Sequence, residues 1–238
     1  MGKKALVSGA SRGIGRAVAE VLARRGYDLY LTCRSREGQL LELKRKLEEE
    51  QGISCTAMLC NMGSYEEVCR LFEKIDRLDV LVNNAGISYV GLLSDMKVRQ
   101  WEEIINTNLN SMFYTCSQAI PLMLKEQAGR IVNISSIWGR VGASMEVAYS
   151  AAKGGVDSFT RALAKELAPS HICVNALACG VIDTEMNACF SREERELLRA
   201  EIPADRFGRP EEAAEMVWQI IESPEYMTGQ IIGLDGGW

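Results

Sequence analysis

The segment KKALVSGASRGIGRAVAEVLARRG, residues 3–26, decides the fold of this chain. Its apolar run Ala5–Ser8 is typical of a buried strand in a parallel sheet. A glycine-rich turn comes next, and Arg16–Arg25 then carries apolar residues at helical spacing. The glycines of this turn are Gly9, Gly13 and Gly15. A strand, a glycine-rich turn and a helix in this order predict a dinucleotide-binding unit.

The turn itself predicts a site for the pyrophosphate of a dinucleotide. Glycines let the backbone approach the phosphates closely, and the following helix N-terminus presents free N–H groups and the positive end of its dipole. The spacing is G-x3-G-x-G, which differs from the common G-x-G-x-x-G pattern. A tight strand-to-helix turn without a ligand is therefore the alternative that the spacing leaves open.

Apolar runs alternate with helical stretches along the rest of the chain. The runs are LVSG, LYLTC, SCTAMLC, VLVNNAG, RIVNISS, CVNALAC and QIIGLDG. This alternation predicts an α/β fold, a single-domain Rossmann-type doubly wound sheet of about seven parallel strands with helices on both faces. We expect one domain over residues 1–238, because no linker, repeat or low-complexity stretch interrupts the pattern.

Two long helices are predicted, at Trp101–Lys125 and Tyr149–Leu167, and a short capped helix at Ser191–Arg199. Residues 181–209 follow the sixth strand and so lie at the carboxyl edge of the sheet, where ligands bind in such folds. We expect this segment to be a substrate lid, with a merely mobile loop as the alternative.

The end of the second strand, Asp28–Cys33, bears on which nicotinamide cofactor the site accepts. An NAD site places a carboxylate there for the ribose 2′-hydroxyl, but this chain continues with Arg34 and Arg36. Arg12, inside the glycine turn, should lie nearby. Guanidinium groups without a carboxylate favour a 2′-phosphate, and hence NADP(H). The alternative is that Arg34 and Arg36 are solvated loop charges.

The string YSAAK places Tyr149 and Lys153 four residues apart, on one face of a helix. An ammonium one turn away favours the charged form of a phenol, and so lowers its pKa. Upstream, Ser136 offers a hydroxyl that could bind the same small-molecule oxygen. Together these groups indicate reduction of a carbonyl or oxidation of an alcohol. A half-exposed tyrosine beside a solvated lysine is the alternative for the pair alone.

Composition excludes several other classes of function. With a net charge of −5, nucleic-acid binding is not expected, because phosphate contacts need clustered basic residues. No apolar run approaches about 20 residues, so we expect neither a membrane span nor a signal peptide. The cysteines form no CxxC pair and the only histidine is His171, so no metal site is expected. Free cysteines in this number favour a reducing cytoplasm.

These motifs together resemble the classical short-chain dehydrogenases/reductases over nearly the whole chain. The resemblance rests on SGASRGIG, NNAG at Asn83–Gly86, NTNLN around Asn108, Ser136, YSAAK, VNALACG, the pair Asp183–Thr184 and the closing TGQIIGLDGG. Within the family the chain is most similar to bacterial 3-oxoacyl-acyl-carrier-protein reductases of fatty acid biosynthesis. A narrower similarity, in SSIWGRVGASMEVAYS, LAKELAPS and the final GGW, is to reductases of the 5-aminopentanone group on elongation factor P.

The resemblance implies a role for each matching residue. Tyr149 would be the catalytic acid/base, Ser136 would polarise the substrate carbonyl, Lys153 would hold the nicotinamide ribose while lowering the phenol pKa, and Asn108 would anchor a water in the proton path. Implied cofactor-binding residues are Gly9, Ser11, Arg12, Gly13, Ile14, Gly15, Arg34, Asn61, Met62, Asn83, Ala85, Gly86, Tyr149, Lys153, Gly180, Ile182 and Thr184. Family members pair their long helices across a subunit interface, so the resemblance implies a homodimer or homotetramer. Surplus apolar residues on the long helices, Met112, Phe113, Phe159 and Leu163, support such an assembly weakly.

The chain departs from the family pattern in the substrate region. Cys179 precedes Gly180 where the family has proline, so the loop loses a fixed φ angle, and Cys179 itself is either a packing residue or a reactive thiol. Acyl-carrier reductases often carry arginines near the site mouth, and the matching positions here hold Gln127 and Ser170. These positions count against a carrier-protein partner, and the expected substrate is a small-molecule or carrier-bound carbonyl compound.

Glu146 leaves the substrate class open. It lies three residues before Tyr149, so a carboxylate near the substrate could pair with the ammonium of an aminopentanone, while a neutral acyl chain gains nothing from it. A salt bridge between Glu146 and Arg140, or a subunit contact, is the alternative. A cofactor-binding scaffold without turnover is a further alternative, which the complete set Asn108, Ser136, Tyr149 and Lys153 disfavours.

Overall fold

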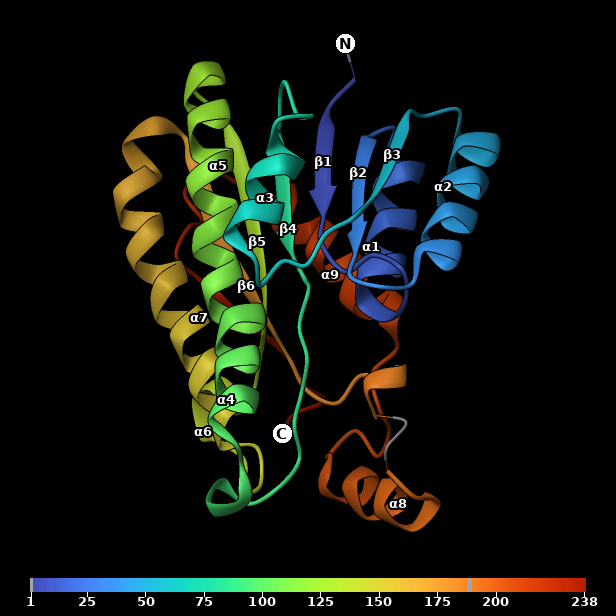
Figure 1. The fold of residues 1–238 in the computed structure, drawn as a ribbon, viewed down its shortest axis with the longest axis vertical. Helices are drawn as coiled ribbons and strands as arrows, with labels where there is room; N and C mark the ends of the chain where they lie inside the picture. The colour runs from blue at the N-terminus through green and yellow to red at the C-terminus, as the bar shows by residue number, and fades with distance from the viewer. Residues whose placement is uncertain (1, 188–189) are drawn as a thin grey trace.

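A computed structural model describes residues 2–187 and 190–238 of the chain. Within these residues, seven strands form a single parallel sheet in the order β3-β2-β1-β4-β5-β6-β7 (Figure 1). The strands are β1 (Lys4–Val7), β2 (Asp28–Cys33), β3 (Cys55–Leu59), β4 (Val80–Asn83), β5 (Gly129–Ser136), β6 (Ile172–Cys179) and β7 (Ile231–Leu234). The order reverses direction between β1 and β4, which is the topological switch point where doubly wound sheets bind ligands.

Helices cover both faces of the sheet, as the alternating pattern predicts. One face carries α1 (Gly13–Arg24), α2 (Glu37–Gln51) and α9 (Pro210–Ile221). The other carries α3 (Tyr65–Phe72), α4 (Val98–Ile105), α5 (Ser111–Glu126) and α7 (Val147–Leu167). The short helices α6 (Trp138–Val141) and α8 (Arg192–Glu201) follow β5 and β6, and α8 stands apart from both layers in Figure 1. The fold is therefore the predicted Rossmann-type α/β architecture.

Side chains of the central strands alternate between two apolar cores. Ala5 and Val7 of β1 pack with α1, α2 and α9, while Leu6 belongs to the core beneath α3, α5 and α7. In β4, Val82 faces the first core and Leu81 the second. Strands buried on both faces read as continuous apolar runs, because successive side chains point to opposite faces. This alternation also decides where the polar residues at the strand ends point.

A polar network crosses the second core and begins at Asn83. Asn83 is the next residue of β4 after Val82, so its side chain points to the α5 side, where it donates to Asn133 Oδ1 at 2.9 Å and accepts from Thr115 Oγ1 at 2.8 Å. Asn133 in turn donates to Thr160 Oγ1 at 2.9 Å. These four buried residues join β4, β5, α5 and α7 through satisfied hydrogen bonds.

Helix boundaries differ from the sequence prediction in two places. Helix α1 begins at Gly13, inside the glycine turn, and not at Arg16. The helix predicted over Trp101–Lys125 is two helices, because a π-helical turn, η2 (Asn106–Asn110), separates α4 from α5. Such turns occur often at functional sites. The short helix after Ser191 is present as α8, with Ser191 accepting from Glu194 in a capping box.

The surplus apolar residues of the long helices are mostly core residues. Met112 and Leu163 are buried in the monomer, and Phe159 is partly buried against the same core. Phe113 alone of these is exposed, at 58%. The four residues therefore support an oligomeric interface less than their sequence pattern indicates, and dimer or tetramer formation stays a prediction. None of the described helices combines the length and the apolar character needed to cross a membrane.

Candidate active site

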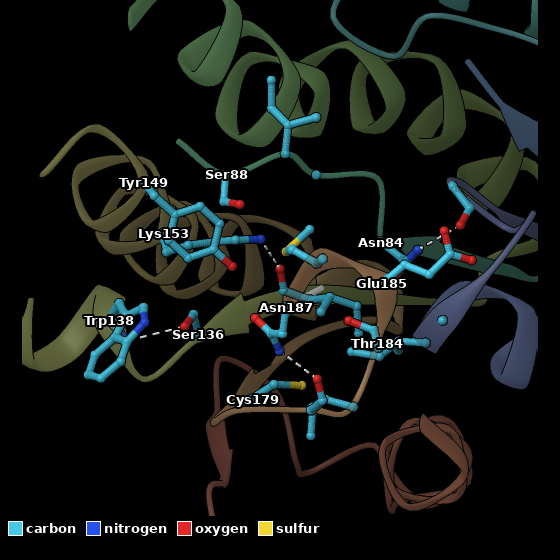
Figure 2. Close-up of a pocket in the computed structure, with 18 of the residues that line it drawn as sticks. Asn84, Ser88, Ser136, Trp138, Tyr149, Lys153, Cys179, Thr184, Glu185 and Asn187 are labelled. Atoms are coloured by element: carbon cyan, nitrogen blue, oxygen red, sulfur yellow. Dashed lines mark hydrogen bonds between the residues drawn. The ribbon is translucent and has the colours of Figure 1, made fainter. Parts of the chain in front are cut away.

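A cavity of about 990 Å³ opens at the carboxyl ends of the strands, over the switch point between β1 and β4. Its walls come from the glycine turn, the ends of β2, β3, β4, β5 and β6, the N-terminal part of α7 and the segment after β6. In Figure 2, Tyr149, Lys153 and Ser136 stand on one side, and Thr184 and Glu185 on the other. Elements far apart in sequence thus build one elongated site.

The glycine turn forms a cradle beneath one end of this cavity. Gly9 and Gly13 adopt left-handed backbone conformations, with φ of 67° and 55°, which side chains disfavour. A Cβ atom at Gly9 would lie 3.0 Å from Ala85 Cα, and one at Gly13 would lie 3.2 Å from Thr184 Cγ2. Arg12 occupies the N-cap of α1, and its side chain makes no capping hydrogen bond. The first N–H groups of α1 are thereby free to bind an anion, so the turn fits a dinucleotide pyrophosphate.

Gly15 packs against protein and does not line the cavity, contrary to the sequence prediction. A Cβ atom there would collide with Gly9 O and Asn84 Nδ2. The third glycine of the turn therefore lets the helix approach the strand end. Its role in cofactor binding stays a prediction.

At the end of β4, the cavity is lined by Asn84 and not by Asn83, the residue that the sequence analysis predicts as a cofactor contact. Asn83 faces the polar network in the core, for the reason of strand alternation given above. Asn84 lines the cavity, and its Nδ2 donates to Ser8 O at 2.9 Å and to Gly9 O at 3.1 Å. Asn84 thus ties the end of β4 to the glycine turn.

Most of the other predicted cofactor contacts do line the cavity. They are Gly9, Ser11, Arg12, Gly13, Ile14, Arg34, Asn61, Met62, Ala85, Gly86, Tyr149, Lys153, Gly180, Ile182 and Thr184. Asn61 already uses its side-chain oxygen locally, because it accepts from Gly63 N at 3.2 Å. The cofactor-binding assignments themselves stay predictions.

The arginines near the end of β2 are paired with carboxylates that the sequence did not place there. Arg12 Nη1 lies 2.6 Å from Glu185 Oε2, and Arg36 Nη1 lies 2.9 Å from the same oxygen. Arg34 turns away from them and pairs with Glu103 Oε1 of α4 at 2.7 Å. The expectation of a carboxylate-free region is therefore wrong, because Glu185 reaches it from the segment after β6. Arg36, and not Arg34, shares a partner with Arg12.

The catalytic candidates meet at the other end of the cavity. Ser136 closes β5, Tyr149 and Lys153 share one face of α7, and all three line the cavity. Lys153 is only 3% exposed and its Nζ donates to Ile134 O at 2.7 Å, 5.5 Å from the centre of the Tyr149 ring. Ser136 Oγ accepts from Trp138 N at 3.2 Å, which orients the hydroxyl (Figure 2). A carbonyl oxygen could meet the phenol and this hydroxyl together.

Burial sets the charge states at this end. It lowers the pKa of Lys153 to about 8, and the nearby Cys179 and Asp157 act in the opposite direction. Burial raises the pKa of Tyr149 above its ordinary value, with a further rise from Glu146 and Cys179, while the hydrogen bond with Ser136 lowers it. Lys153 is not among the groups that shift the Tyr149 pKa, so the predicted activation of the phenol by its ammonium stays a prediction.

Asn108 lies beneath the cavity wall and does not line it. Its buried amide accepts from Ile87 N at 2.8 Å and donates to Ile87 O at 2.7 Å. A Cβ atom on Gly86 would lie 3.1 Å from Asn108 Oδ1. The π-helical turn η2 therefore presents Asn108 to the chain after β4, and the water-anchoring role stays a prediction.

Two tryptophan rings and the carboxylate of Glu146 also line the cavity. Trp138 and Trp238 both line it, with ring centres 4.9 Å apart and an edge-to-face angle of 78°. Glu146, at the N-cap of α7, lines the same region, and burial raises its pKa. Among the described residues, no arginine, lysine or histidine lies within 4.0 Å of the Glu146 carboxylate, so the proposed salt bridge with Arg140 is absent from that part of the chain.

Two other predictions concern the rim of the site. Cys179 is 5% exposed and burial raises its pKa to about 12, so it is a neutral packing thiol at the cavity wall and not a reactive thiolate. Gln127 and Ser170 lie two residues before the starts of β5 and β6, at the edge of the sheet opposite the cavity. They are therefore not at the mouth of this chain's own site.

Several cavity residues escaped the sequence analysis. These are Asn84, Arg36 as a partner of Arg12, Trp138, Trp238 and Glu185. The neighbouring position of Asn84 to Asn83 and the alternation of β4 could have identified Asn84. Trp138 and Trp238 belong to the motifs SSIWG and GGW, but only the folded chain shows that the two rings meet at the site, and Glu185 gave no signal in the sequence.

The chain is similar to known proteins over most or all of its length. The family model described as short chain dehydrogenase matches residues 3–195. An uncharacterized oxidoreductase of Bacillus subtilis, YmfI, is 39% identical over 240 residues, which cover 100% of this chain and 99% of the relative. The 3-oxoacyl-acyl-carrier-protein reductase FabG of Aquifex aeolicus is 40% identical over 241 residues, 99% of this chain and 97% of the relative. The protein of the same name from Staphylococcus aureus strain Mu50 is 39% identical over 246 residues, 100% of this chain and 98% of the relative.

Proposed function

Because this chain belongs to the short-chain dehydrogenase family, whose members are nicotinamide-dependent oxidoreductases, we propose that it is an NADPH-dependent reductase of a 3-oxoacyl thioester. The observation that carries the proposal is the convergence of Ser136, Tyr149 and Lys153 on one end of a cavity whose other end is the glycine turn. A small-molecule thioester and a carrier-bound one both present the same carbonyl group.

The chain's own residues supply proton transfer and orientation. Ser136 donates a hydrogen bond to the substrate carbonyl oxygen, and Tyr149 gives its proton to that oxygen as negative charge develops. Lys153, protonated below about pH 8, stabilises the phenolate that remains. A bound nicotinamide supplies the hydride. Tyr149 is partly buried at the cavity wall, and a substrate that fills the cavity would displace water from it, which strengthens each of these electrostatic interactions.

Support for NADP(H) comes from the arginines at the opposite end. Arg12, Arg34 and Arg36 all line the cavity there, and guanidinium groups bind a 2′-phosphate through charge-assisted hydrogen bonds. The names of the Aquifex and Staphylococcus relatives support the 3-oxoacyl substrate class.

The variant Tyr149→Phe tests the proposed chemistry. It removes the proton donor and keeps the ring, so we expect kcat with NADPH and an acetoacetyl thioester to fall about 10²- to 10⁴-fold. The rate is measured by the loss of reduced-nicotinamide absorbance, and NADPH binding is measured separately by fluorescence titration.

The control is Tyr226→Phe, which removes the same hydroxyl from a fully exposed ring outside the cavity and should keep full activity. Turnover by Tyr149→Phe at the wild-type rate would refute the assignment of Tyr149 as the proton donor. An absence of turnover in the wild-type protein, with NADPH still bound, would favour the non-catalytic scaffold.

We propose as a second candidate that the substrate is a ketone bearing an ammonium group, as in the 5-aminopentanone group on elongation factor P. The specific support is Glu146, whose half-buried carboxylate has no cationic neighbour among the described residues and lines the same region as Trp138 and Trp238. An ammonium there would gain an ion pair with the carboxylate and a cation–π contact with an indole ring.

Glu146→Gln distinguishes the two substrates. For a cationic ketone we expect kcat/KM to fall about tenfold, because the ion pair is lost, while for an acetoacetyl thioester it should stay within about twofold. Equal effects on both substrates would end the second candidate. The cytoplasmic location, the assembly into a homodimer or homotetramer and the movement of residues 181–209 as a lid stay predictions.

A further inference from the structure

The carboxylate of Glu185 sits between two guanidinium groups at the cofactor end of the cavity. Its Oε2 lies 2.6 Å from Arg12 Nη1 and 2.9 Å from Arg36 Nη1. The hydrogen bond with Arg12 is the main reason that the pKa of Glu185 is lowered, so the carboxylate is charged at neutral pH. All three side chains also line the cavity.

The backbone around Glu185 is fixed against the glycine turn. Glu185 begins the 3₁₀ turn η4 (Glu185–Asn187), which Asn187 closes by donating to Ile182 O at 2.7 Å through its side chain and to Thr184 O at 3.0 Å through its backbone. Thr184 packs on Gly13, as the near contact of a Gly13 Cβ atom indicates. The carboxylate is thus delivered to the arginines from a chain segment already docked beside the expected pyrophosphate site.

We propose that Glu185 occupies the position of the cofactor 2′-phosphate and sets the preference between NADP(H) and NAD(H). The proposal rests on the proposed use of Arg12 and Arg36 for that phosphate. A 2′-phosphate and the carboxylate are both anions that need the same two guanidinium groups. NADP(H) must therefore displace Glu185, whereas a cofactor with only a 2′-hydroxyl leaves the ion pairs intact.

The ion pairs reduce affinity for the phosphorylated cofactor in two ways. The fraction of protein with free arginines is smaller than one, and the apparent dissociation constant rises in inverse proportion to that fraction. A displaced carboxylate that stays nearby also repels the phosphate. The side chains are 43% (Arg12), 41% (Arg36) and 49% (Glu185) exposed, so both effects are screened by salt and should be moderate.

The pairing of Arg34 with Glu103 is separate from this arrangement. Arg34 Nη1 lies 2.7 Å from Glu103 Oε1, on α4, and no described contact links this pair to Glu185. Removing the Glu103 charge therefore frees an arginine of the same region without touching the proposed competitor. It serves as a comparison for the specificity of the Glu185 effect.

Calorimetric binding of two nucleotide fragments tests the proposal without catalysis. Adenosine 2′,5′-bisphosphate carries the 2′-phosphate, and 5′-AMP lacks it. Glu185→Gln should tighten binding of the bisphosphate about three- to tenfold at low salt and leave 5′-AMP within about twofold, with the gain shrinking as ionic strength rises. Glu196→Gln, which removes the same charge from α8 where it pairs only with Arg199, is the matched control.

The possible results separate the inference about Glu185 from the proposed NADP(H) preference and from the reductase assignment. An unchanged affinity for the bisphosphate in Glu185→Gln, in a variant whose melting temperature matches the wild type, overturns the inference, and so does an equal gain for both fragments or an equal gain in Glu196→Gln. If Glu103→Gln gives the larger gain, Glu103 holds the competing role and the inference is also wrong. A wild-type protein that binds both fragments equally refutes the proposed NADP(H) preference itself. Turnover of NADPH, measured as above, reports on the reductase assignment independently.

Discussion

The two ends of the cavity use charge in opposite ways. At the catalytic end, Lys153 is 3% exposed, has no carboxylate within 4.0 Å among the described residues, and burial lowers its pKa to about 8. At the cofactor end, Arg12 and Arg36 remain about half as exposed as free side chains and share the carboxylate of Glu185. The charged group at the catalytic end is therefore desolvated and unpaired with a carboxylate, whereas the charged groups at the cofactor end form ion pairs that solvent still reaches.

This difference predicts effects of different size. Desolvation can shift a pKa by several units and is not screened by salt, so a buried group such as Lys153 strongly affects both reactivity and stability. Exposed ion pairs contribute about 0–1 kcal/mol and weaken at high ionic strength. Substitutions at the catalytic end should therefore act through rate and pH, and those at the cofactor end through selectivity and salt.

The largest expected effect is that of Lys153→Met. We expect turnover with NADPH to fall at least about 10²-fold, because the ammonium that stabilises the phenolate is gone. The same variant should be more stable than the wild type near pH 7, by up to about 3 kcal/mol, since the protein no longer buries a charged amine. Denaturant unfolding at several pH values measures the gain.

The stability advantage of Lys153→Met over the wild type should decrease as pH rises. The pKa of Lys153 is about 8 in the folded protein and 10.5 ordinarily, so between these values the unfolded chain binds more protons and wild-type stability rises with pH. The advantage of Lys153→Met should be full below pH 8 and disappear above about pH 10.5. A variant that is less stable at pH 7, or a gain that does not change with pH, would contradict the desolvation argument.

The smaller effect concerns the arginines. Arg12→Ala and Arg36→Ala should each lower the ratio of kcat/KM for NADPH to that for NADH about five- to tenfold at low salt, because each loses a phosphate contact. Arg34→Ala should change the ratio less than twofold, since Arg34 faces Glu103. The three ratios are compared at low and high ionic strength.

If Arg34→Ala has the greatest effect, Arg34 is the main phosphate contact, in agreement with its place among the cofactor-binding residues predicted from the sequence. Such a result would also mean that the pairing with Glu103 opens when the cofactor binds. A selectivity change that does not diminish with salt would remove the distinction between the two ends of the cavity.

The layers of the fold were predictable because they depend on local patterns. Apolar runs of strand length between amphipathic stretches specify the sheet, and the bounds of β2 at Asp28–Cys33 agree with the prediction to the residue. The break at η2 (Asn106–Asn110) was not predictable, because a π-helical turn carries no periodic signal of its own. The core position of Met112 and Leu163 depends on neighbouring layers and not on their own helix.

The candidate site was predictable where one motif holds all its members, as in the glycine turn and the Tyr149–Lys153 pair. It was not predictable where a side chain arrives from a distant segment. Glu185 reaches Arg12 across 173 positions of sequence, and Trp238 reaches Trp138 from the last strand. Strand alternation decided between Asn83 and Asn84, which the motif NNAG alone does not do.

The buried amide and hydroxyl groups that begin at Asn83 have a consequence for engineering and for sequence drift. Each residue of this set is a hydrogen-bond partner of another. Changing any one of them to an apolar residue therefore leaves a buried polar atom without its partner, which lowers the free energy of unfolding by about 1–3 kcal/mol. Exchanging all four together would remove that penalty. The core at this sheet should therefore tolerate the simultaneous replacement of all four residues by apolar ones better than the replacement of a single one.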